Sequence, residues 1–148
     1  MSEIRAAIDA ATKAAMKARD KERLAALRLI NAEIKQFEVD KRETPDDDTI
    51  ITLLTRMQKQ RRDSIAAYSD AGRDDLVATE EFELGIVQEF LPAQLDAAEI
   101  EAAIAAAIEA TGASSMKDMG AVMGRLSGEL AGRADMGAVS AQVRAKLG

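Results

Sequence analysis

The hydrophobic residues of the first ninety positions recur at intervals of three and four, which is the spacing of one face of an α-helix. This pattern predicts four helices. Aspartates or a proline break stand at the expected starts of the second, third and fourth helices, and the second ends before a proline break, the third at a glycine and the fourth before a proline. The expected landmarks are residues 3–18 for the first helix, a cap at Asp20 for the second, the Thr44–Pro45 break before the third, its stop at Gly72, and a cap at Asp74 or Asp75 for the fourth.

Beyond Leu91–Pro92 the chain becomes rich in alanine and its helices become shorter. Three helices are expected here. Their landmarks are Ile100, Ile104 and Ile108 before a stop at Thr111–Gly112, a capping box of Ser115 and Asp118 before a helix ending at Gly132, and a cap at Asp135 before Val139, Val143 and Leu147. The sequence therefore predicts an all-α protein with two helical domains, a long-helix bundle or hairpin over residues 1–91 and a compact three-helix domain over 92–148.

The sixth expected helix contains a glycine at every fourth position. At 100° per residue its apolar residues share one arc, its charged residues lie opposite, and its small residues lie beside the apolar arc. These three sets are Met116, Met119, Met123, Leu126 and Leu130; Asp118, Arg125 and Glu129; and Gly120, Ala121, Gly124, Ser127, Gly128 and Ala131.

Glycines inside a helix each cost about 1 kcal/mol relative to alanine, so another interaction must offset them. With Gly132, the residues Gly120, Gly124 and Gly128 form a candidate face for close approach. Either a neighbouring helix of the same domain packs closely on this face, or a ligand backbone or another protein's helix lies on it. The stretch lacks the lysine–serine ending and the preceding strand of a nucleotide-binding loop.

The composition leaves little for catalysis. The chain contains no cysteine and no histidine, which removes thiolate metal sites, the commonest general base and the commonest metal ligand. The three aspartates Asp46–Asp48 follow a proline and are expected to be charges at a helix start rather than a cation site. We expect no catalytic residue, no metal and no cofactor in the isolated chain.

The net charge of −6 argues against general binding of polyanions, so a nucleic acid would need a local basic patch. Residues 1–42 contain ten basic and seven acidic residues, and two further segments are locally basic, although on composition alone solvated helix faces are the simpler explanation. The candidate residues are Arg56, Lys59, Arg61 and Arg62 in the first segment, and Lys117, Arg125, Arg133, Arg144 and Lys146 in the second. No apolar run reaches the length of a membrane span and the start of the chain does not read as a signal peptide, so a cytoplasmic setting is expected.

Four stretches together resemble the GatB/YqeY family over nearly the full length. They are LRLINAEIKQFEVDKR (27–42), MQKQRRDSIAAYSDAGRDDL (57–76), EFLPAQL (89–95) and MKDMGAVMGRLSGELAGRADMGAVSAQVRAKL (116–147). The resemblance implies a helical N-terminal domain and a three-helix domain. The latter is similar to the tail of the GatB subunit of the glutamine-dependent amidotransferase that acts on misacylated Glu-tRNA or Asp-tRNA. That tail is implied to contact tRNA, whereas the kinase and transamidation chemistry lies in parts that this chain lacks.

The sequence leaves three functions open. The leading hypothesis is a tRNA-associated accessory protein without catalysis, in which the basic residues contact phosphates and the glycine face permits close approach. The alternative is a protein–protein adaptor whose glycine face receives another protein's helix. The third is a component of a carbon–nitrogen ligase, with glutamine as amido donor, that is active only in a complex.

Overall fold

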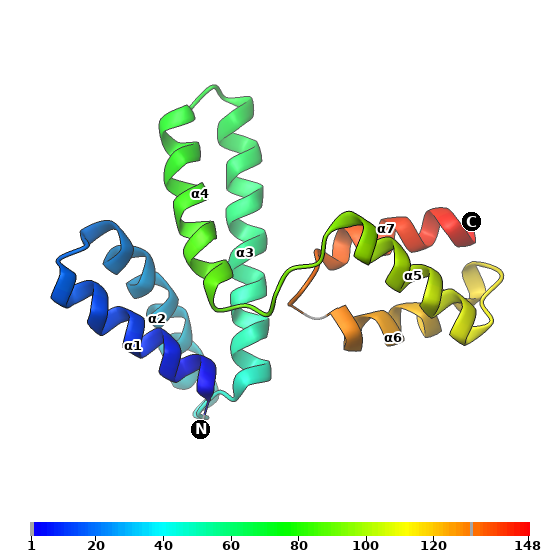
Figure 1. Cartoon of the computed structure of the whole chain (residues 1–148), viewed down its shortest axis with the longest axis horizontal. Coiled ribbons are helices and arrows are strands. Elements are labelled where there is room, and N and C mark those ends of the chain that lie inside the picture. Colours follow the sequence, from blue (N-terminus) through cyan, green and yellow to red (C-terminus); the bar gives the residue numbers. More distant parts are fainter. Residues whose placement is uncertain (1, 131) are drawn as a thin grey trace. The chain divides into compact units, whose positions relative to one another are not determined.

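A computed structural model describes residues 2–130 and 132–148, and within them it contains seven α-helices, one short 3-10 helix and no strand (Figure 1). The all-α prediction is confirmed. Ala131, which the helical wheel places among the small residues, lies outside the described residues. The helices are α1 (Glu3–Ala18), α2 (Lys21–Lys41), α3 (Asp47–Asp70), α4 (Asp74–Glu89), α5 (Ala97–Thr111), η1 (Met116–Asp118), α6 (Met119–Leu130) and α7 (Met136–Leu147).

Side-chain caps begin most of the helices, as the sequence predicts. The carboxylates of Asp20, Asp46 and Asp135 accept hydrogen bonds from backbone N–H groups of the first turns of α2, α3 and α7, at 3.2, 2.9 and 3.0 Å. The capping box of Ser115 and Asp118 is also present, although it opens η1 rather than α6 directly. Each cap satisfies a backbone donor that a helix start leaves unpaired.

The start of α4 differs from the prediction. Arg73 occupies the capping position without a side-chain hydrogen bond to the helix, so neither Asp74 nor Asp75 is the cap. Both aspartates lie inside the first turn, where a negative charge favours the positive end of the helix dipole. The guanidinium of Arg73 contacts the Asp75 carboxylate at 3.1 Å.

The chain divides into two compact units, Met1–Leu91 and Pro92–Gly148, which is compatible with the boundary expected at Leu91–Pro92. In the N-terminal unit the hairpins α1–α2 and α3–α4 pack together around one apolar core. The fully enclosed side chains of that core include Ile8, Leu27, Ile30, Ile34, Ile50, Leu54 and Met57.

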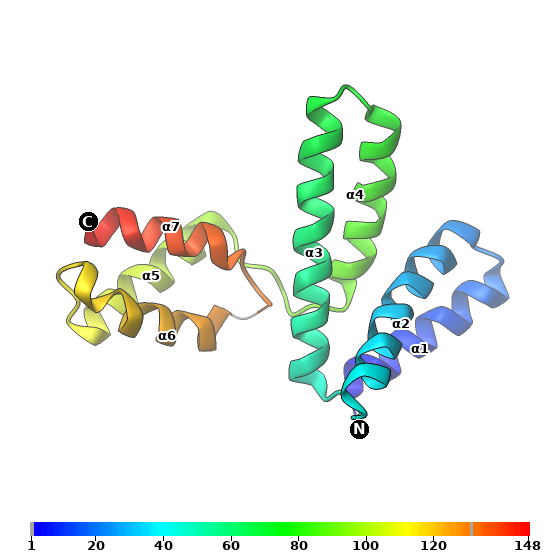
Figure 2. The same cartoon turned by 180° about the vertical axis from the view of Figure 1, so that it is seen from behind.

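The α3–α4 hairpin is held partly by polar contacts. Gln58 is only 2% exposed, and its Oε1 accepts a hydrogen bond of 3.1 Å from Gln88 Nε2. One turn further, Arg61 Nε and Glu83 Oε2 lie 3.4 Å apart. Burial raises the pKa of Glu83, although the charge of Arg61 opposes this. No residue from 59 to 85 is fully buried, and both views show this end of the hairpin standing clear of α1 and α2 (Figures 1 and 2).

In the C-terminal unit, α5, α6 and α7 enclose a second core. Its members include Ile104, Val122, Leu126, Val139 and Val143. The segment before α5 is tied to the α6–α7 connection, because Leu95 N–H donates to the Arg133 carbonyl at 2.9 Å and Gln94 Nε2 donates to the Gly132 carbonyl at 2.6 Å. The unit is therefore closed on itself by hydrogen bonds as well as by apolar packing.

Candidate nucleic-acid interface

The buried face of α6 agrees with the predicted one except at two positions. Val122, Leu126 and Leu130 are the buried residues of this helix, whereas Met116 is 43% exposed. The assignment of Met116 to the core face is therefore wrong and Val122 was missed, whereas the other four predicted residues lie on the core face, namely Met119, Met123, Leu126 and Leu130. The physical reason is that Met116–Asp118 form a 3-10 turn with three residues per turn, so the wheel of an α-helix does not apply there.

The glycines lie on the side of α6 opposite its fully buried residues. Gly120, Gly124 and Gly128 each precede a buried residue by two positions, which corresponds to about 200° around the helix. The predicted position of the glycines beside the core is thus corrected. The charged residues Arg125 and Glu129, rather than the glycines, flank the buried face.

The glycine row of α6, defined here as Gly120, Gly124 and Gly128, is open. A Cβ atom added at any of the three would meet nothing within 4 Å beyond the helix's own backbone. Close packing against another helix of the C-terminal unit therefore does not explain the row. Gly132 is different, because it is buried and ends the helix with a φ of 74°.

The basic candidates of the C-terminal unit do not form one cluster. Arg133 Nε donates to the Ala93 carbonyl at 3.1 Å, next to the α6–α7 connection. The exposed residues Lys117, Arg144 and Lys146 belong to η1 and the last turn of α7, which lie at the other end of the unit (Figure 2). Arg144 and Lys146 are two residues apart on α7, so their side chains leave the helix in nearly opposite directions.

Two basic residues lie next to the glycine row. Lys117 is exposed in the turn that leads directly into α6. Arg125 follows Gly124 on the exposed surface, where its Nε lies 3.3 Å from the Glu129 carboxylate. The Asp118 carboxylate nearby is engaged, since it accepts hydrogen bonds from the backbone N–H groups of Ser114 and Ser115 at 2.9 and 3.3 Å.

The basic segment of α3 is largely compensated by acidic neighbours. Arg56 contacts Glu33 of α2 at 3.1 Å, Lys59 contacts Asp63 at 2.9 Å, and Arg61 faces Glu83 inside the hairpin. Among the described residues Arg62 makes no ion pair, although its side chain is half-buried. The structure therefore gives this segment fewer available charges than its sequence indicates.

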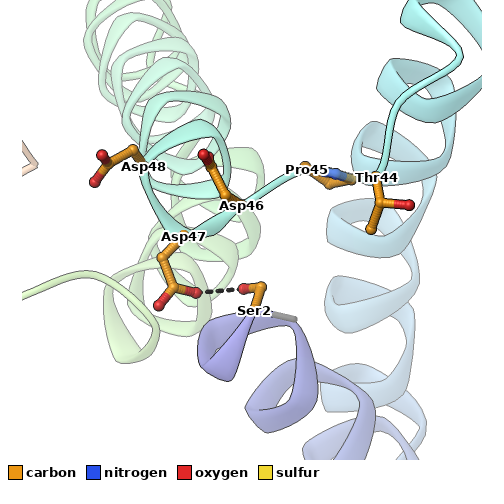
Figure 3. Close-up of a pocket in the computed structure, with 6 residues that line it drawn as sticks. All are labelled: Ser2, Thr44, Pro45, Asp46, Asp47 and Asp48. Carbon is orange, nitrogen blue, oxygen red and sulfur yellow. Dashed lines mark hydrogen bonds between the residues drawn. The ribbon is translucent and has the colours of Figure 1, made fainter.

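The aspartates at the start of α3 line a shallow pocket with Ser2, Thr44 and Pro45 (Figure 3). Asp46 caps α3, and Asp47 accepts hydrogen bonds from the Ser2 hydroxyl and, at 3.2 Å, from the backbone N–H of Ile4. Hydrogen bonds from Thr49 lower the pKa of Asp46, and those from Ser2 and Ile4 lower that of Asp47. Both carboxylates thus act as acceptors at helix starts, as the sequence predicts.

A family model described as "Yqey-like protein" matches residues 5–147. The chain belongs to this family. Three relatives of the YqeY-like chain are each named "Altered inheritance of mitochondria protein 41, mitochondrial". Those of Eremothecium gossypii and Vanderwaltozyma polyspora are 35% identical over 82 and 80 residues, which are 55% and 53% of this chain. The chain spans less than half of these two proteins, 45% and 43% of their lengths.

The relative of Pyrenophora tritici-repentis is 28% identical over 145 residues, 95% of this chain and 79% of its own length. The similarity to this protein thus extends over both units. The names of all three relatives refer to mitochondria, so the cytoplasmic setting stays a prediction for the YqeY-like chain. In the described part of the chain, no helix combines the length and hydropathy needed to cross a membrane.

Proposed function

We propose that this YqeY-like protein is a tRNA-associated accessory protein, with no catalytic centre of its own, that serves glutamine-dependent amidation of tRNA in the cytoplasm. The observation that carries the proposal is the open glycine row of α6. Without side chains, this surface lets a phosphodiester backbone approach the helix closely. The sequence resemblance of this unit to the tail of the GatB subunit, which is implied to contact tRNA, supports RNA as the ligand.

The charges around the row support contact with phosphates. From Ala113 to the end the chain has five basic and three acidic residues. Asp118 and Asp135 are engaged as helix caps, and Glu129 is paired with Arg125. Lys117 and Arg125 border the row and would position the RNA backbone, which is recognised by shape and charge rather than by base sequence.

The proposal is tested by titrating bulk tRNA against the full chain at several salt concentrations. The test variant is Lys117→Gln with Arg125→Gln. A matched control is Lys13→Gln with Arg73→Gln, because Lys13 is exposed and Arg73, like Arg125, contacts a nearby carboxylate. Loss of two phosphate contacts should lower the slope of log affinity against log salt by about two.

The control variant should retain the slope of the unaltered protein. If tRNA affinity falls equally in the test and control variants, only net charge matters. If tRNA binding is insensitive to salt, contact through phosphates is excluded. Either result would contradict the proposed site. Separately, glutamine-dependent amidation of tRNA by the purified chain alone would contradict the absence of a catalytic centre.

The second candidate is a protein–protein adaptor, and the geometry of the row itself favours it. The row offers van der Waals contact but few hydrogen-bond donors, because backbone amides inside a helix are already paired. A partner helix could pack there at short interaxial distance. Gly124→Leu should then abolish capture of a protein partner, with the circular dichroism spectrum unchanged because the site is open, while tRNA affinity keeps its salt slope.

A further inference from the structure

Helix α2 has a basic residue at every seventh position. Lys21, Arg28, Lys35 and Arg42 follow this interval without interruption from the first residue of the helix to its C-cap. Seven residues turn the helix by about 700°, so each member is displaced by about 20° from the one before it, and the last by about 60° from the first. They form a row about 31 Å long with a step of about 10.5 Å. We call these four residues the α2 basic stripe.

The stripe is available to a ligand. All four side chains are exposed, and among the described residues none of them makes an ion pair. This distinguishes them from other arginines of the same unit, since Arg5, Arg23 and Arg56 each contact a glutamate. Glu38 lies on the neighbouring side of α2, but its carboxylate is held at 3.0 Å by Arg5 of α1.

Helix α2 also separates its charges by side. Its acidic residues Glu22, Glu33 and Asp40 lie about 100–160° around the helix from the stripe. Glu33 faces α3, where Arg56 contacts it at 3.1 Å. A helix face that serves only solvation has both signs interspersed. The side of α2 that carries the stripe is basic from Lys21 to Arg42, although Glu22 and Asp40 are exposed elsewhere on the helix and Glu38 lies beside the stripe.

We propose that the α2 basic stripe binds the phosphate backbone of RNA as a second contact surface, separate from the glycine row. It rests on the proposed function for the choice of RNA as the polyanion. A duplex carries phosphates along its whole length, about one charge per 1.7 Å of axis in B-DNA, so a row of cations about 31 Å long faces several of them. A row of cations without ion pairs among the described residues is complementary in charge to the phosphate backbone of an RNA duplex.

A membrane surface fits the stripe less well. Binding in a lipid interface requires bulky apolar residues beside the basic ones. The residues beside the stripe include the alanines Ala25 and Ala32, and Val39 is a large apolar side chain exposed near it. Leu29, which is also exposed, lies about 100° around the helix from Arg28. The stripe therefore offers charge with little apolar area, which favours RNA over lipid.

The test compares two full-length variants in a salt series with bulk tRNA. Arg28→Gln with Lys35→Gln removes two members of the stripe. Lys41→Gln with Arg73→Gln removes the same charges from exposed positions elsewhere, since Lys41 lies on another side of α2. Glutamine is a good helix former, so both variants should keep their circular dichroism spectra. In the stripe variant, the slope of log affinity for tRNA against log salt should be smaller by about two. This variant should also bind tRNA at least about tenfold more weakly at about 50 mM salt.

A control variant that loses as much as the stripe variant would overturn the inference. The variant Lys117→Gln with Arg125→Gln separates the two proposals. If only the stripe variant loses affinity, the stripe stands and the glycine-row site fails. If only the Lys117/Arg125 variant loses affinity, the inference fails and the proposed site stands. Absence of tRNA binding by the unaltered protein would overturn both.

Two further probes address other polyanions. Phosphatidylserine vesicles and polyglutamate are titrated against the same pair of variants. Weaker binding of these probes than of tRNA is expected. Stripe-dependent binding of vesicles or of polyglutamate, with tRNA binding indifferent to the stripe, would overturn the inference in favour of a membrane or an acidic protein.

Discussion

Asp47 connects the starts of two helices, because its carboxylate accepts hydrogen bonds from Ser2 at the start of α1 while Asp47 itself begins α3 (Figure 3). A second hydrogen bond comes from the backbone N–H of Ile4. Both bonds favour the ionised carboxylate, and they hold its pKa below the ordinary value of 3.8. This residue therefore links protonation to the stability of the N-terminal unit.

We expect Asp47→Asn to lower the melting temperature at neutral pH, because the amide is a weaker acceptor than the carboxylate. A depressed pKa in the folded state gives stability that is present above 3.8 and is lost as the pH falls through the folded value. The difference between the two proteins should thus shrink in acid. Thermal unfolding followed by circular dichroism at about pH 7 and about pH 3 measures this, with Asp48→Asn as control. A difference that grows in acid would contradict it.

Gly124 permits a direct test of the open row. Gly124→Ala should increase the free energy of unfolding by about 1 kcal/mol, because alanine is the better helix former and its Cβ would meet nothing within 4 Å. Gly112→Ala is the contrasting variant. Gly112 has a φ of 65°, so a Cβ at this position should lower the free energy of unfolding. Urea unfolding measures both. A destabilised Gly124→Ala would mean that the row packs against something in the free protein.

Many single-residue features could be predicted from sequence alone. Asp20 and Asp135 act as the predicted caps, and Asp46 caps α3 where only a helix-start charge was predicted, because these roles depend on local chain geometry. The capping box of Asp96 and Glu99 at the start of α5 was missed, although its spacing of three is visible in the sequence. Ion pairs between helices, such as that of Arg56 with Glu33, depend on packing and could not be predicted.

At the scale of helices, periodicity predicts the existence and the bounds of elements better than their orientation. The start and end of α1 agree with the predicted residues 3–18. In α6 the prediction was wrong for Met116, because this residue lies in a 3-10 turn before the α-helix, and it placed the glycines beside the buried face rather than opposite it. The candidate site depends on that orientation, since it decides whether the glycines face the protein or the solvent. The seven-residue interval of the α2 basic stripe was likewise present in the sequence, but the absence of ion pairs along it required the structure.

The polar contacts inside the α3–α4 hairpin make a prediction at this scale. Gln88→Ala should destabilise the protein by about 1–3 kcal/mol, because the buried Gln58 loses the donor to its Oε1. Replacing both glutamines with leucine should recover much of this loss, since no buried polar atom then remains unpaired. Urea unfolding of Gln58→Leu, Gln88→Leu and the double variant measures the coupling. Additive effects would show that the two side chains do not interact.

At the scale of the whole molecule, the chain contains two separate hydrophobic cores. The boundary at Leu91–Pro92 is visible in the sequence as a change in composition. The contacts that close the C-terminal unit are not visible there, because they join Ala93 and Leu95 to Arg133, about forty residues away. A proline and a shift toward alanine thus predict where a unit begins, but not what holds its first residues in place.

We expect a fragment of residues 92–148 to fold alone, because its core and its closing hydrogen bonds lie within it. A fragment of residues 97–148 should be less stable, since it lacks the segment that bonds to the α6–α7 connection. Thermal unfolding of both fragments by circular dichroism measures the difference. Failure of the longer fragment to fold would show that the C-terminal unit depends on the N-terminal one.

The glycine row also affects how α6 moves. Three glycines weaken the helix by about 1 kcal/mol each, while the opposite side is anchored by Val122, Leu126 and Leu130. Such a helix should open locally more often than α5, and its backbone amides should exchange with deuterium sooner. A ligand lying on the row would close these openings. Amide exchange of α6 therefore provides a built-in reporter of occupancy, one that needs no knowledge of which molecule is bound.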